Sequence, residues 1–449
     1  MFSPSDTIVA IATPPGRGGI GVVRISGATA SRIAASMAGR AALEPRRATL
    51  TELRVDGEPI DRAVVTFFPA PHSYTGDDVV EVSAHGSPVV LRAIVEASMR
   101  AGARLAEPGE FTFRAYLNGR IDLVQAEAVQ DLVDAVTPLQ ARTAFDQLEG
   151  TLTSRIHEID AALFDLSARL EASLDFPEEG YHFVEPGAAA AEIDAIASQI
   201  DALLTDARRG RMVREGAQVA IIGRPNSGKS SLFNRLAGVG RAIVTDIPGT
   251  TRDLVTEVID IDGAAITVVD TAGVHGSPAD AVELEGIARA RAAEAVADLV
   301  LVVLDRSRPM TDDDRTLLTD CTSRLHLVVA NKCDLPDAWQ AGEPGDGVLH
   351  VSAKDGQGIA DLRREIGVRL SATDRLHDTP AVTNTRHVHL LSDARAALVR
   401  AADATRAGTA EEFVAADLAD ARARIEEVTG VRTPDDVLEA IFSRFCIGK

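Results

Sequence analysis

The sequence lacks the features that mark secreted and membrane-spanning proteins. It contains only three cysteines, Cys321, Cys333 and Cys446. They are too few for a disulfide framework and favour a reducing compartment, so we expect a cytoplasmic protein. No apolar run approaches the roughly 20 residues that span a bilayer, which excludes a membrane helix. The first residues lack a basic end followed by an apolar core, so no signal peptide is expected.

Positive charge is also scarce. The chain has 46 Lys and Arg against 67 Asp and Glu, a net charge of −21. This balance argues against a broad nucleic-acid-binding surface. If the protein acts on nucleic acid, a local patch or a basic partner must provide most of the contact. With 449 residues, 45% of them hydrophobic, the chain is long enough for two to four domains with cores.

The clearest motif lies between an apolar strand and a predicted helix. Val219 to Ile222 lead into Gly223-Arg-Pro-Asn-Ser-Gly-Lys-Ser230, which has the spacing G-x-x-x-x-G-K-S of a phosphate-binding loop. Gly223 and Gly228 allow the backbone to turn its N–H groups toward one anion. Lys229 adds a positive charge, Ser230 offers a hydroxyl to Mg²⁺, and the helix from Ser231 points its positive end at the phosphates.

Two further motifs select the nucleotide. Asn331-Lys-Cys-Asp334 follows a buried strand, and its carboxylate can accept both N1–H and N2–H₂ of guanine. Adenine offers no such pair of donors. Ser352-Ala-Lys354 follows the next strand and can close over the base. The sequence therefore predicts binding of GTP rather than ATP.

The hydrolytic apparatus is expected in two switch segments. Asp270-Thr-Ala-Gly273 ends a strand, where Asp270 can hold Mg²⁺ through water and the Gly273 amide can sense the γ-phosphate. In the first switch, Thr251 is the better Mg²⁺ candidate beside Thr250. Ras-type enzymes place a water-orienting glutamine directly after D-x-x-G, but this chain has Val274 there. Either hydrolysis is negligible or another polar residue orients water, and the nearby acids are Asp280, Glu283 and Glu285.

The order of the predicted elements gives an α/β fold joined to a helical one. Residues 1–118 read as an α/β domain, and residues 216–371 as a doubly wound sheet with a β-hairpin at 255–269. Residues 119–215 and 372–449 are helical, and the late helices are too short to form a core alone. We expect them to pack on the earlier helices, so that the nucleotide domain is inserted in a discontinuous helical domain.

Two local expectations concern this helical region. Arg208 to Arg214 form a basic segment, which is either a solvated hinge or a contact for an anionic partner. Thr433-Pro-Asp-Asp436 is a helix start with Thr433 as the cap and Pro434 as the first helical residue.

Several segments together resemble the tRNA-modification GTPase family MnmE, also called TrmE. The resemblance covers nearly the whole chain and includes the terminal Phe445-Cys-Ile-Gly-Lys449, which related GTPases lack. The other segments are Thr13-Pro-Pro-Gly-Arg-Gly-Gly-Ile20, Glu107-Pro-Gly-Glu-Phe-Thr112, Ala115-Tyr-Leu-Asn-Gly119 and the phosphate loop.

The resemblance implies a folate-binding N-terminal domain that also makes the protein a homodimer. The residues matching the family's tetrahydrofolate contacts (5-formyl or 5,10-methylene form) are Arg24, Glu81, Arg120 and Lys449, with Arg120 where a lysine is common. Cys446 matches a terminal cysteine thought to lie near the folate.

The resemblance also implies that the GTPase domains meet around K⁺, which acts as an arginine finger does. Asn226 matches the K⁺ ligand, with Thr245, Ile247 and Thr250 supplying further oxygens. Aligning Val282-Glu283 with the family's V-E pair selects Glu283 as the catalytic, water-positioning acid, although an extra residue near Ser277-Pro278 shifts this segment.

The expected nucleotide and metal contacts fall in four segments. They are Asn226, Ser227, Gly228, Lys229, Ser230 and Ser231 in the phosphate loop; Thr245, Asp246, Ile247, Pro248, Gly249, Thr250 and Thr251 in the first switch; Asp270, Thr271, Ala272 and Gly273 in the second; and Asn331, Lys332, Asp334, Ser352, Ala353 and Lys354 around the base.

By this resemblance the protein works with a flavin-dependent partner, MnmG, to add an aminomethyl or carboxymethylaminomethyl group at C5 of the wobble uridine of certain tRNAs. Folate supplies the carbon, GTP hydrolysis drives the conformational cycle, and the partner holds most of the tRNA. The alternative is a GTP-dependent switch in ribosome or RNA assembly without base chemistry, which needs neither the N-terminal domain nor the Cys446 tail. A folate-dependent methyltransferase fits poorly because the switch motifs are intact.

Overall fold

The computed structural model describes residues 6–175, 186–240, 255–261, 263–270, 297–340, 342–345, 347–370 and 382–449. The chain forms two compact units. The first comprises residues 1–130, 147–196 and 396–449, and the second comprises residues 131–146 and 197–395. The helical region is divided between the two units, so the expected boundaries after residues 118, 215 and 371 stay predictions.

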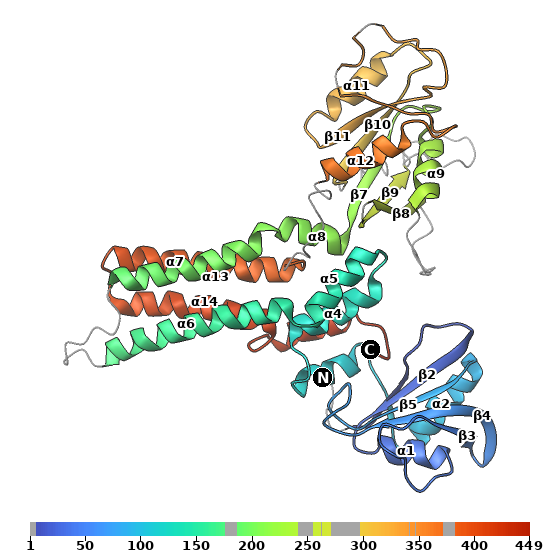
Figure 1. The fold of residues 1–449 in the computed structure, drawn as a ribbon, viewed down its shortest axis with the longest axis vertical. Helices are drawn as coiled ribbons and strands as arrows, with labels where there is room; N and C mark the ends of the chain where they lie inside the picture. Colours follow the sequence, from blue (N-terminus) through green and yellow to red (C-terminus); the bar gives the residue numbers. More distant parts are fainter. Residues whose placement is uncertain are drawn as a thin grey trace. The chain divides into compact units, whose positions relative to one another are not determined.

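The first unit contains a six-stranded sheet (Figure 1). Its strands lie in the order β3-β4-β5-β2-β1-β6, and all neighbours are antiparallel except β1 and β6. The strands are β1 (Ile8–Ile11), β2 (Gly18–Ser26), β3 (Thr49–Val55), β4 (Glu58–Phe68), β5 (Val79–Gly86) and β6 (Arg104–Leu105). Helices α1 (Ala30–Met37) and α2 (Pro88–Arg100) bury Ile33 and Ile94 against Val82 of the sheet. Because side chains alternate along β5, Glu81 lies on the other face.

Helices make up the remaining part of the first unit, and some of them belong wholly or partly to the second unit, which includes residues 131–146 and 197–395. The helical elements are α3 (Glu110–Leu117), α4 (Leu123–Asp134), α5 (Pro138–Leu148), α6 (Thr151–Asp175), α7 (Pro186–Thr205), α8 (Ala207–Glu215), α13 (Thr385–Arg406), α14 (Glu411–Thr429) and α15 (Asp435–Phe442). Helix α14 packs along α6 (Figure 1), and Arg422 Nε lies 3.1 Å from Asp160 Oδ1. The expectation that late helices pack on early ones is therefore confirmed.

The structure describes both segments of the helical region that were singled out from the sequence. The basic segment is helical, since Arg208 to Arg214 lie in α8, and Arg214 Nε is 2.7 Å from Asp131 Oδ2. Its role as a hinge or as a contact for an anionic partner stays a prediction. Helix α15 begins one residue later than predicted, with Pro434 as the N-cap. The Thr433 hydroxyl does not cap it, because it donates to the Glu427 carbonyl at 3.2 Å.

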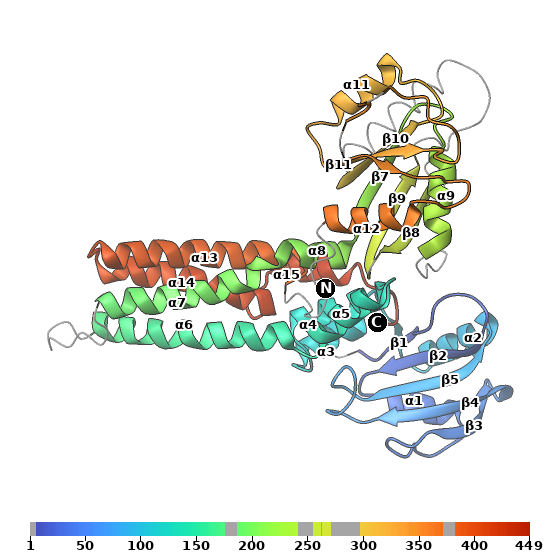
Figure 2. The same cartoon turned by 45° about the horizontal axis from the view of Figure 1, so that its top comes forward.

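The second unit is built on another six-stranded sheet (Figure 2), in the order β12-β11-β10-β7-β9-β8. Its strands are β7 (Ala217–Ile222), β8 (Val255–Ile261), β9 (Ala264–Asp270), β10 (Leu299–Asp305), β11 (His326–Asn331) and β12 (Leu349–His350). Only the β8–β9 pair is antiparallel among these described strands, as the predicted hairpin requires. Helices α9 (Lys229–Gly240) and α12 (Ile359–Arg369) cover one face, and α11 (Asp312–Asp320) covers the other. The doubly wound fold is thus confirmed.

The parallel register aligns the carboxyl ends of the central strands. Asp270 pairs with Ile221 in β7, and Asn331 pairs with Asp305 in β10. Ligand sites of doubly wound sheets lie at this edge. Within the described ranges, none of the helices combines the length and the apolar character needed to cross a bilayer.

Candidate nucleotide and tail sites

The phosphate loop joins β7 to α9 and depends on glycine at two positions. Gly228 has φ +95°, and a Cβ there would lie 2.2 Å from Asn331 Nδ2. A Cβ on Gly223 would lie 2.3 Å from the Val303 carbonyl oxygen. The glycines are therefore needed for close approach to neighbouring strands as well as for their backbone conformation.

The loop holds a charge and an unpaired hydroxyl ready for an anion. Lys229 Nζ donates to the carbonyls of Gly223 at 2.8 Å and Arg224 at 2.9 Å. The Ser227 Oγ is buried and has no hydrogen-bond partner in the part of the chain that the structure describes. Buried polar atoms are normally satisfied, and the first N–H groups of α9 are exposed to the same loop. These residues fit a bound phosphate chain.

Asn331 connects the phosphate loop to the base side of the site. Its side chain is 1% exposed. Its Nδ2 donates to the Ser227 carbonyl at 2.9 Å, and its Oδ1 accepts from the Ala353 amide at 3.1 Å. Asp334, the predicted acceptor for guanine, is held by a 2.9 Å hydrogen bond from Ser352 Oγ. The structure therefore brings the predicted phosphate and base residues together at one sheet edge.

Two residues that sequence reasoning missed complete this arrangement. Asp305 ends β10 and binds Lys332 Nζ at 2.6 Å, while Lys332 Nζ also donates to the Asn226 carbonyl at 2.9 Å. Burial raises the pKa of Asp305, but hydrogen bonds from Lys332 and Ser307 outweigh it and leave the pKa lowered. The position of Asp305 at the end of a buried parallel strand is the sequence feature that could have predicted its role.

Arg235 is the second of these residues. Its Nε in α9 donates to the Ala353 carbonyl at 3.1 Å.

The remaining predicted nucleotide residues are only partly placed. Ser230 and Ser231 are exposed at the start of α9, Asn226 is exposed with φ +65°, and the Lys354 carbonyl accepts from Arg235. The side chain of Asp270 is not described. The residues Thr245, Asp246, Ile247, Pro248, Gly249, Thr250, Thr251, Thr271, Ala272, Gly273 and Glu283 lie outside the described residues and stay predictions.

A second site lies in the first unit, where the end of the chain meets the N-terminal sheet. Arg24 and Glu81 stand opposite each other on β2 and β5, with Arg24 Nη2 2.8 Å from Glu81 Oε1. Arg24 Nη1 also donates to the Gly448 carbonyl at 3.3 Å. Its guanidinium carbon lies 5.0 Å from the Tyr74 ring centroid and 5.7 Å from that of Phe111.

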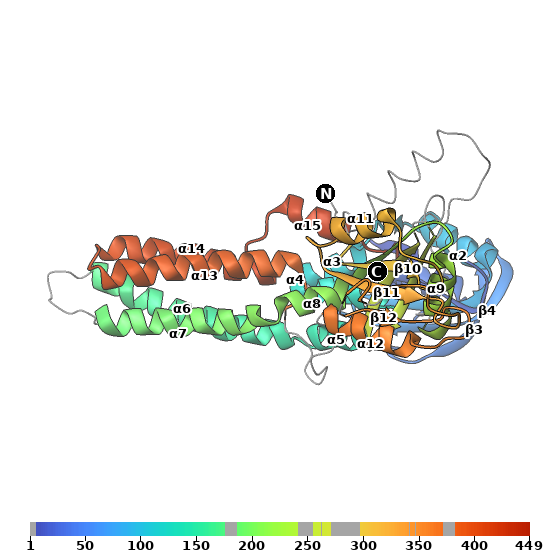
Figure 3. The ribbon, with the colours of Figure 1, turned by 90° about the horizontal axis from the view of Figure 1, so that it is seen from above.

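Close packing fixes the course of the chain end. Gly448 has φ +98°, and a Cβ there would lie 2.4 Å from the Ile11 carbonyl oxygen. The Phe111 amide donates to the Lys449 carbonyl at 3.2 Å. Helix α15 precedes this segment and packs on α3 (Figure 3), with the Phe442 ring centroid 5.0 Å from that of Phe113. The glycine in the terminal motif therefore has a physical explanation.

Lys449, Cys446 and Arg120 differ in how they relate to Arg24 and Glu81. Arg24, Glu81 and Lys449 are called the tail cluster below. Burial, followed by the positive charge of Arg24, lowers the pKa of Lys449, and the negative charges of Cys446 and Glu81 offset this only in part. Cys446 is exposed. Arg120 is exposed beside Gly76, and among the described residues it has no polar contact with Arg24, Glu81 or Lys449. The structure thus gathers three of the four residues expected to contact folate.

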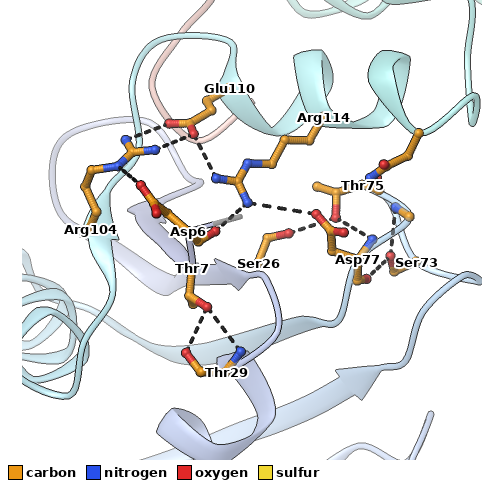
Figure 4. A network of polar contacts seen from close by, with 12 residues as sticks. Asp6, Thr7, Ser26, Thr29, Ser73, Thr75, Asp77, Arg104, Glu110 and Arg114 are labelled. Carbon is orange, nitrogen blue, oxygen red and sulfur yellow. Dashed lines mark hydrogen bonds and ion pairs between the residues drawn. The ribbon is translucent and has the colours of Figure 1, made fainter. Parts of the chain in front are cut away.

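A buried ion cluster holds α3 in place beneath the tail (Figure 4). Glu110 is fully buried and accepts from Arg104 Nη2 at 2.7 Å and Arg114 Nη2 at 3.0 Å. Arg114 Nη1 also donates to the Asp6 carbonyl at 2.6 Å. Burial raises the pKa of Glu110, but the bonds from Arg104, the Glu107 amide and Arg114 leave it lowered overall. Sequence reasoning singled out the segment from Glu107 to Thr112 without giving it a role.

The doubly wound sheet, the phosphate loop and the guanine-selective loop define a P-loop GTP-binding protein with an added N-terminal α/β part. A family model described as the MnmE helical domain matches residues 123–446, and one described as the GTP-binding protein TrmE N-terminus matches residues 7–120. The chain belongs to the tRNA modification GTPase MnmE family.

Curated relatives match along their whole length. The chain is 46% identical over 452 residues to the tRNA modification GTPase MnmE of Koribacter versatilis, covering 99% of each chain. It is 43% identical over 454 residues to that of Nitrosomonas europaea, covering 100% of each. Among solved structures, Era of Aquifex aeolicus is similar over 40% of this chain and 66% of its own, with 24% identity and a TM-score of 0.28. A TM-score of 0.28 is too low for that structure to support a conclusion about this chain.

Proposed function

We propose that this chain, a GTPase of tRNA modification that uses GTP and Mg²⁺, is activated by K⁺ and modifies the wobble uridine. With a flavin-dependent partner, MnmG, it adds an aminomethyl or carboxymethylaminomethyl group at C5. The observation that carries the proposal is the joint presence of a guanine-nucleotide site and a structured chain end beside Arg24 and Glu81. A switch in ribosome or RNA assembly would need only the first of these.

The residues of the nucleotide site have distinct tasks in hydrolysis. Phosphoryl transfer is accelerated by positioning and by stabilisation of charge on the phosphate oxygens. Lys229 supplies positive charge to the outer phosphates, and Ser230 with Thr251 and Asp270 holds Mg²⁺. Asn331 keeps the base loop and phosphate loop in register through its two hydrogen bonds. Glu283 orients the attacking water in place of the glutamine that Val274 replaces.

The proposed K⁺ site is supported by the state of Asn226. Its backbone carbonyl is occupied by Lys332 Nζ. Its exposed side-chain amide, in contrast, makes no hydrogen bond to any described residue, so its oxygen is available to a cation. Thr245, Ile247 and Thr250 would add further oxygens. A K⁺ at this place neutralises charge on the phosphates, and GTPase domains of a homodimer would enclose it.

The proposed folate site is supported by the chemistry of the tail cluster. Arg24 and Lys449 are cations available to folate carboxylates, and Glu81 is a carboxylate that can accept from N–H groups of the pterin. Bound folate supplies a one-carbon unit there, with Cys446 nearby and Arg120 as a further contact. The net charge of −21 is consistent with a partner that holds most of the tRNA. The cytoplasmic location stays a prediction.

Three measurements test this proposal. GTP hydrolysis should be faster in KCl than in NaCl at equal ionic strength, and equal rates would refute activation by K⁺. Calorimetry should show binding of 5-formyltetrahydrofolate to the full-length protein. Absence of binding would favour the switch without base chemistry. Glu283→Ala should abolish hydrolysis but leave GTP binding intact; normal turnover would direct attention to Asp280 or Glu285.

A further inference from the structure

A cavity of the nucleotide-binding unit lies outside the phosphate loop and is lined by residues of α9, of β8 and of α12 with the turn before it. Figure 2 shows where these three elements lie in the unit. Its volume is about 580 Å³, within the usual range for small-molecule sites. It is lined by Arg235 of α9, Ile261 of β8, Gly356 of the turn before α12, and Ile359, Ala360, Arg363 and Arg364 of α12. Among the described residues no acid belongs to this lining, although the chain as a whole is strongly acidic.

The arginines of this cavity keep donors that no described residue satisfies. Arg363 donates to the Asp260 carbonyl through Nη2, while its Nη1 is buried without a hydrogen-bond partner among the described residues. Arg235 uses Nε and Nη2 for the carbonyls of Ala353 and Lys354, so its Nη1 is available. A buried guanidinium nitrogen without a partner is costly and marks a place for an absent acceptor.

Asp355 interacts with the charge of Arg235, but no described acid accepts a hydrogen bond from Arg363 Nη1. Asp361 lies 2.8 Å from Arg364, but both side chains are more than half exposed, so the pair is weak. The Asp260 carboxylate accepts from the Gly263 amide at 2.7 Å. The Asp355 carboxylate accepts from the Gln357 amide at 3.0 Å.

We propose that this cavity binds the phosphate group of a nucleotide, either free or within RNA. Three arginines and the first residues of α12 line one cavity, which is a favourable setting for a phosphate. Ile261 and Ile359 add an apolar wall against which a sugar or base can pack. The proposal extends beyond the proposed function, because it concerns a site separate from the GTP loop.

A single tight turn connects this cavity to the guanine side of the nucleotide site. Residues 352–358 are closed by hydrogen bonds from the Ser352 amide to the Gln357 carbonyl at 2.9 Å and from the Gly356 amide to the Ser352 carbonyl at 2.9 Å. At the start of the turn, Ser352 Oγ donates to Asp334 and the Ala353 amide donates to Asn331. Near its end, Gly356 lines the cavity. A phosphate that bridges Arg235 and Arg363 holds this turn more firmly and therefore slows release of GDP.

The test uses the full-length protein saturated with GDP, so that the phosphate loop is already filled. Inorganic phosphate, uridine 5′-monophosphate and tRNA are titrated separately by calorimetry. The variants are Arg363→Gln and the more exposed Arg364→Gln, with Arg369→Gln on the same helix as a matched control outside the cavity. Loss of one charged hydrogen bond should weaken binding about tenfold in the first two variants and leave the control unchanged. The release rate of a fluorescent GDP analogue should fall when the site is occupied.

The three ligands separate the possible sources of the phosphate. Binding of uridine monophosphate that is weakened in both variants supports a free nucleotide. Binding of tRNA alone, weakened in Arg364→Gln but not in Arg369→Gln, supports an RNA phosphate. The proposal is overturned if no ligand binds, or if the cavity variants bind as the wild type does. These titrations do not depend on K⁺ or folate, so failure of the proposed function would leave them interpretable.

Discussion

The nucleotide site and the tail site are assembled in different ways. The first is formed by short segments that each follow a strand of one parallel sheet, and Asn331 joins two of them directly. The second joins Arg24 and Glu81 to a chain end more than 360 residues later, and relies on the buried Glu110 cluster beneath it. The comparison indicates that local backbone geometry controls the first site, whereas tertiary packing controls the second. Each prediction below changes one site and leaves the other as a control.

The largest expected effect on ligand affinity is at the phosphate loop. Gly228→Ala places a Cβ 2.2 Å from Asn331 Nδ2 and should separate the phosphate and base loops. Overpacking of this kind costs about 1–3 kcal/mol, so GTP affinity should fall up to about 100-fold. Fluorescent-nucleotide titration measures it, with Gly238→Ala, where a Cβ meets nothing within 4 Å, as the control. Unchanged GTP affinity would show that contact between these loops is unimportant.

The ion cluster beneath the tail contributes to stability rather than to ligand affinity. Glu110→Gln leaves the buried Arg114 and the half-buried Arg104 without their carboxylate, which costs about 3–5 kcal/mol. Hydrogen exchange of residues 6–26 and 104–117 should become faster, while the exposed Glu96→Gln serves as the control. Because the folded pKa lies below the ordinary 4.5, the stabilisation is present above that pH and is lost as pH falls through the lowered pKa. A variant with the same exchange and pH dependence as the wild type would contradict the role of the cluster.

The tail itself is tested by Gly448→Ala. A Cβ there would lie 2.4 Å from the Ile11 carbonyl oxygen, so the chain end should leave its place beside Arg24. Affinity for 5-formyltetrahydrofolate should fall about tenfold or more, with GTP affinity unchanged. Gly39→Ala is the matched control, since Gly39 has φ +62° but open space around it. Equal folate affinity in the two variants would separate the tail from folate binding.

The smallest effect concerns the charge of Lys449. Its lowered pKa means that the ammonium loses its proton at a pH below the ordinary 10.5. Binding of anionic folate should therefore weaken as pH rises through that window, by about two- to fivefold. Lys449→Arg keeps its charge and should give a flat profile, as calorimetry at several pH values can check. A slope retained in Lys449→Arg would assign the titration to another group.

The sequence predicted the nucleotide site better than the tail site, for a physical reason. Gly228, Lys229, Asn331 and Asp334 lie in short motifs directly after apolar strands, and parallel strands bring their ends together. Asp305 was missed because a lone acid at a strand end has no distinctive spacing. The contacts of Gly448 with Ile11 and of Lys449 with Phe111 carry no local pattern, so only family resemblance pointed to them.

The secondary structure also divides into elements that a local sequence pattern predicts and elements that it does not. Apolar residues recur at helical spacing from Pro88 to Arg100 and predict a helix there, which is α2 of the structure. The short strands β1, β3 and β6 were missed, since two to seven residues carry little periodicity. The apolar residues predict a strand only over Val79 to Val82, whereas β5 extends to Gly86, because Ser83 and His85 are polar residues on its less buried face. Side-chain alternation explains this only after the sheet pairing is known.

The central claim is that the nucleotide site and the tail site serve one tRNA modification. The most direct measurement is nucleoside mass spectrometry of tRNA from a deletion strain carrying wild-type, Gly228→Ala or Gly448→Ala protein. The account predicts that the deletion strain lacks the modified wobble uridines, that the wild type restores them, and that each variant fails to restore them fully. Normal wobble uridines in the deletion strain, or full restoration by Gly448→Ala, would contradict it.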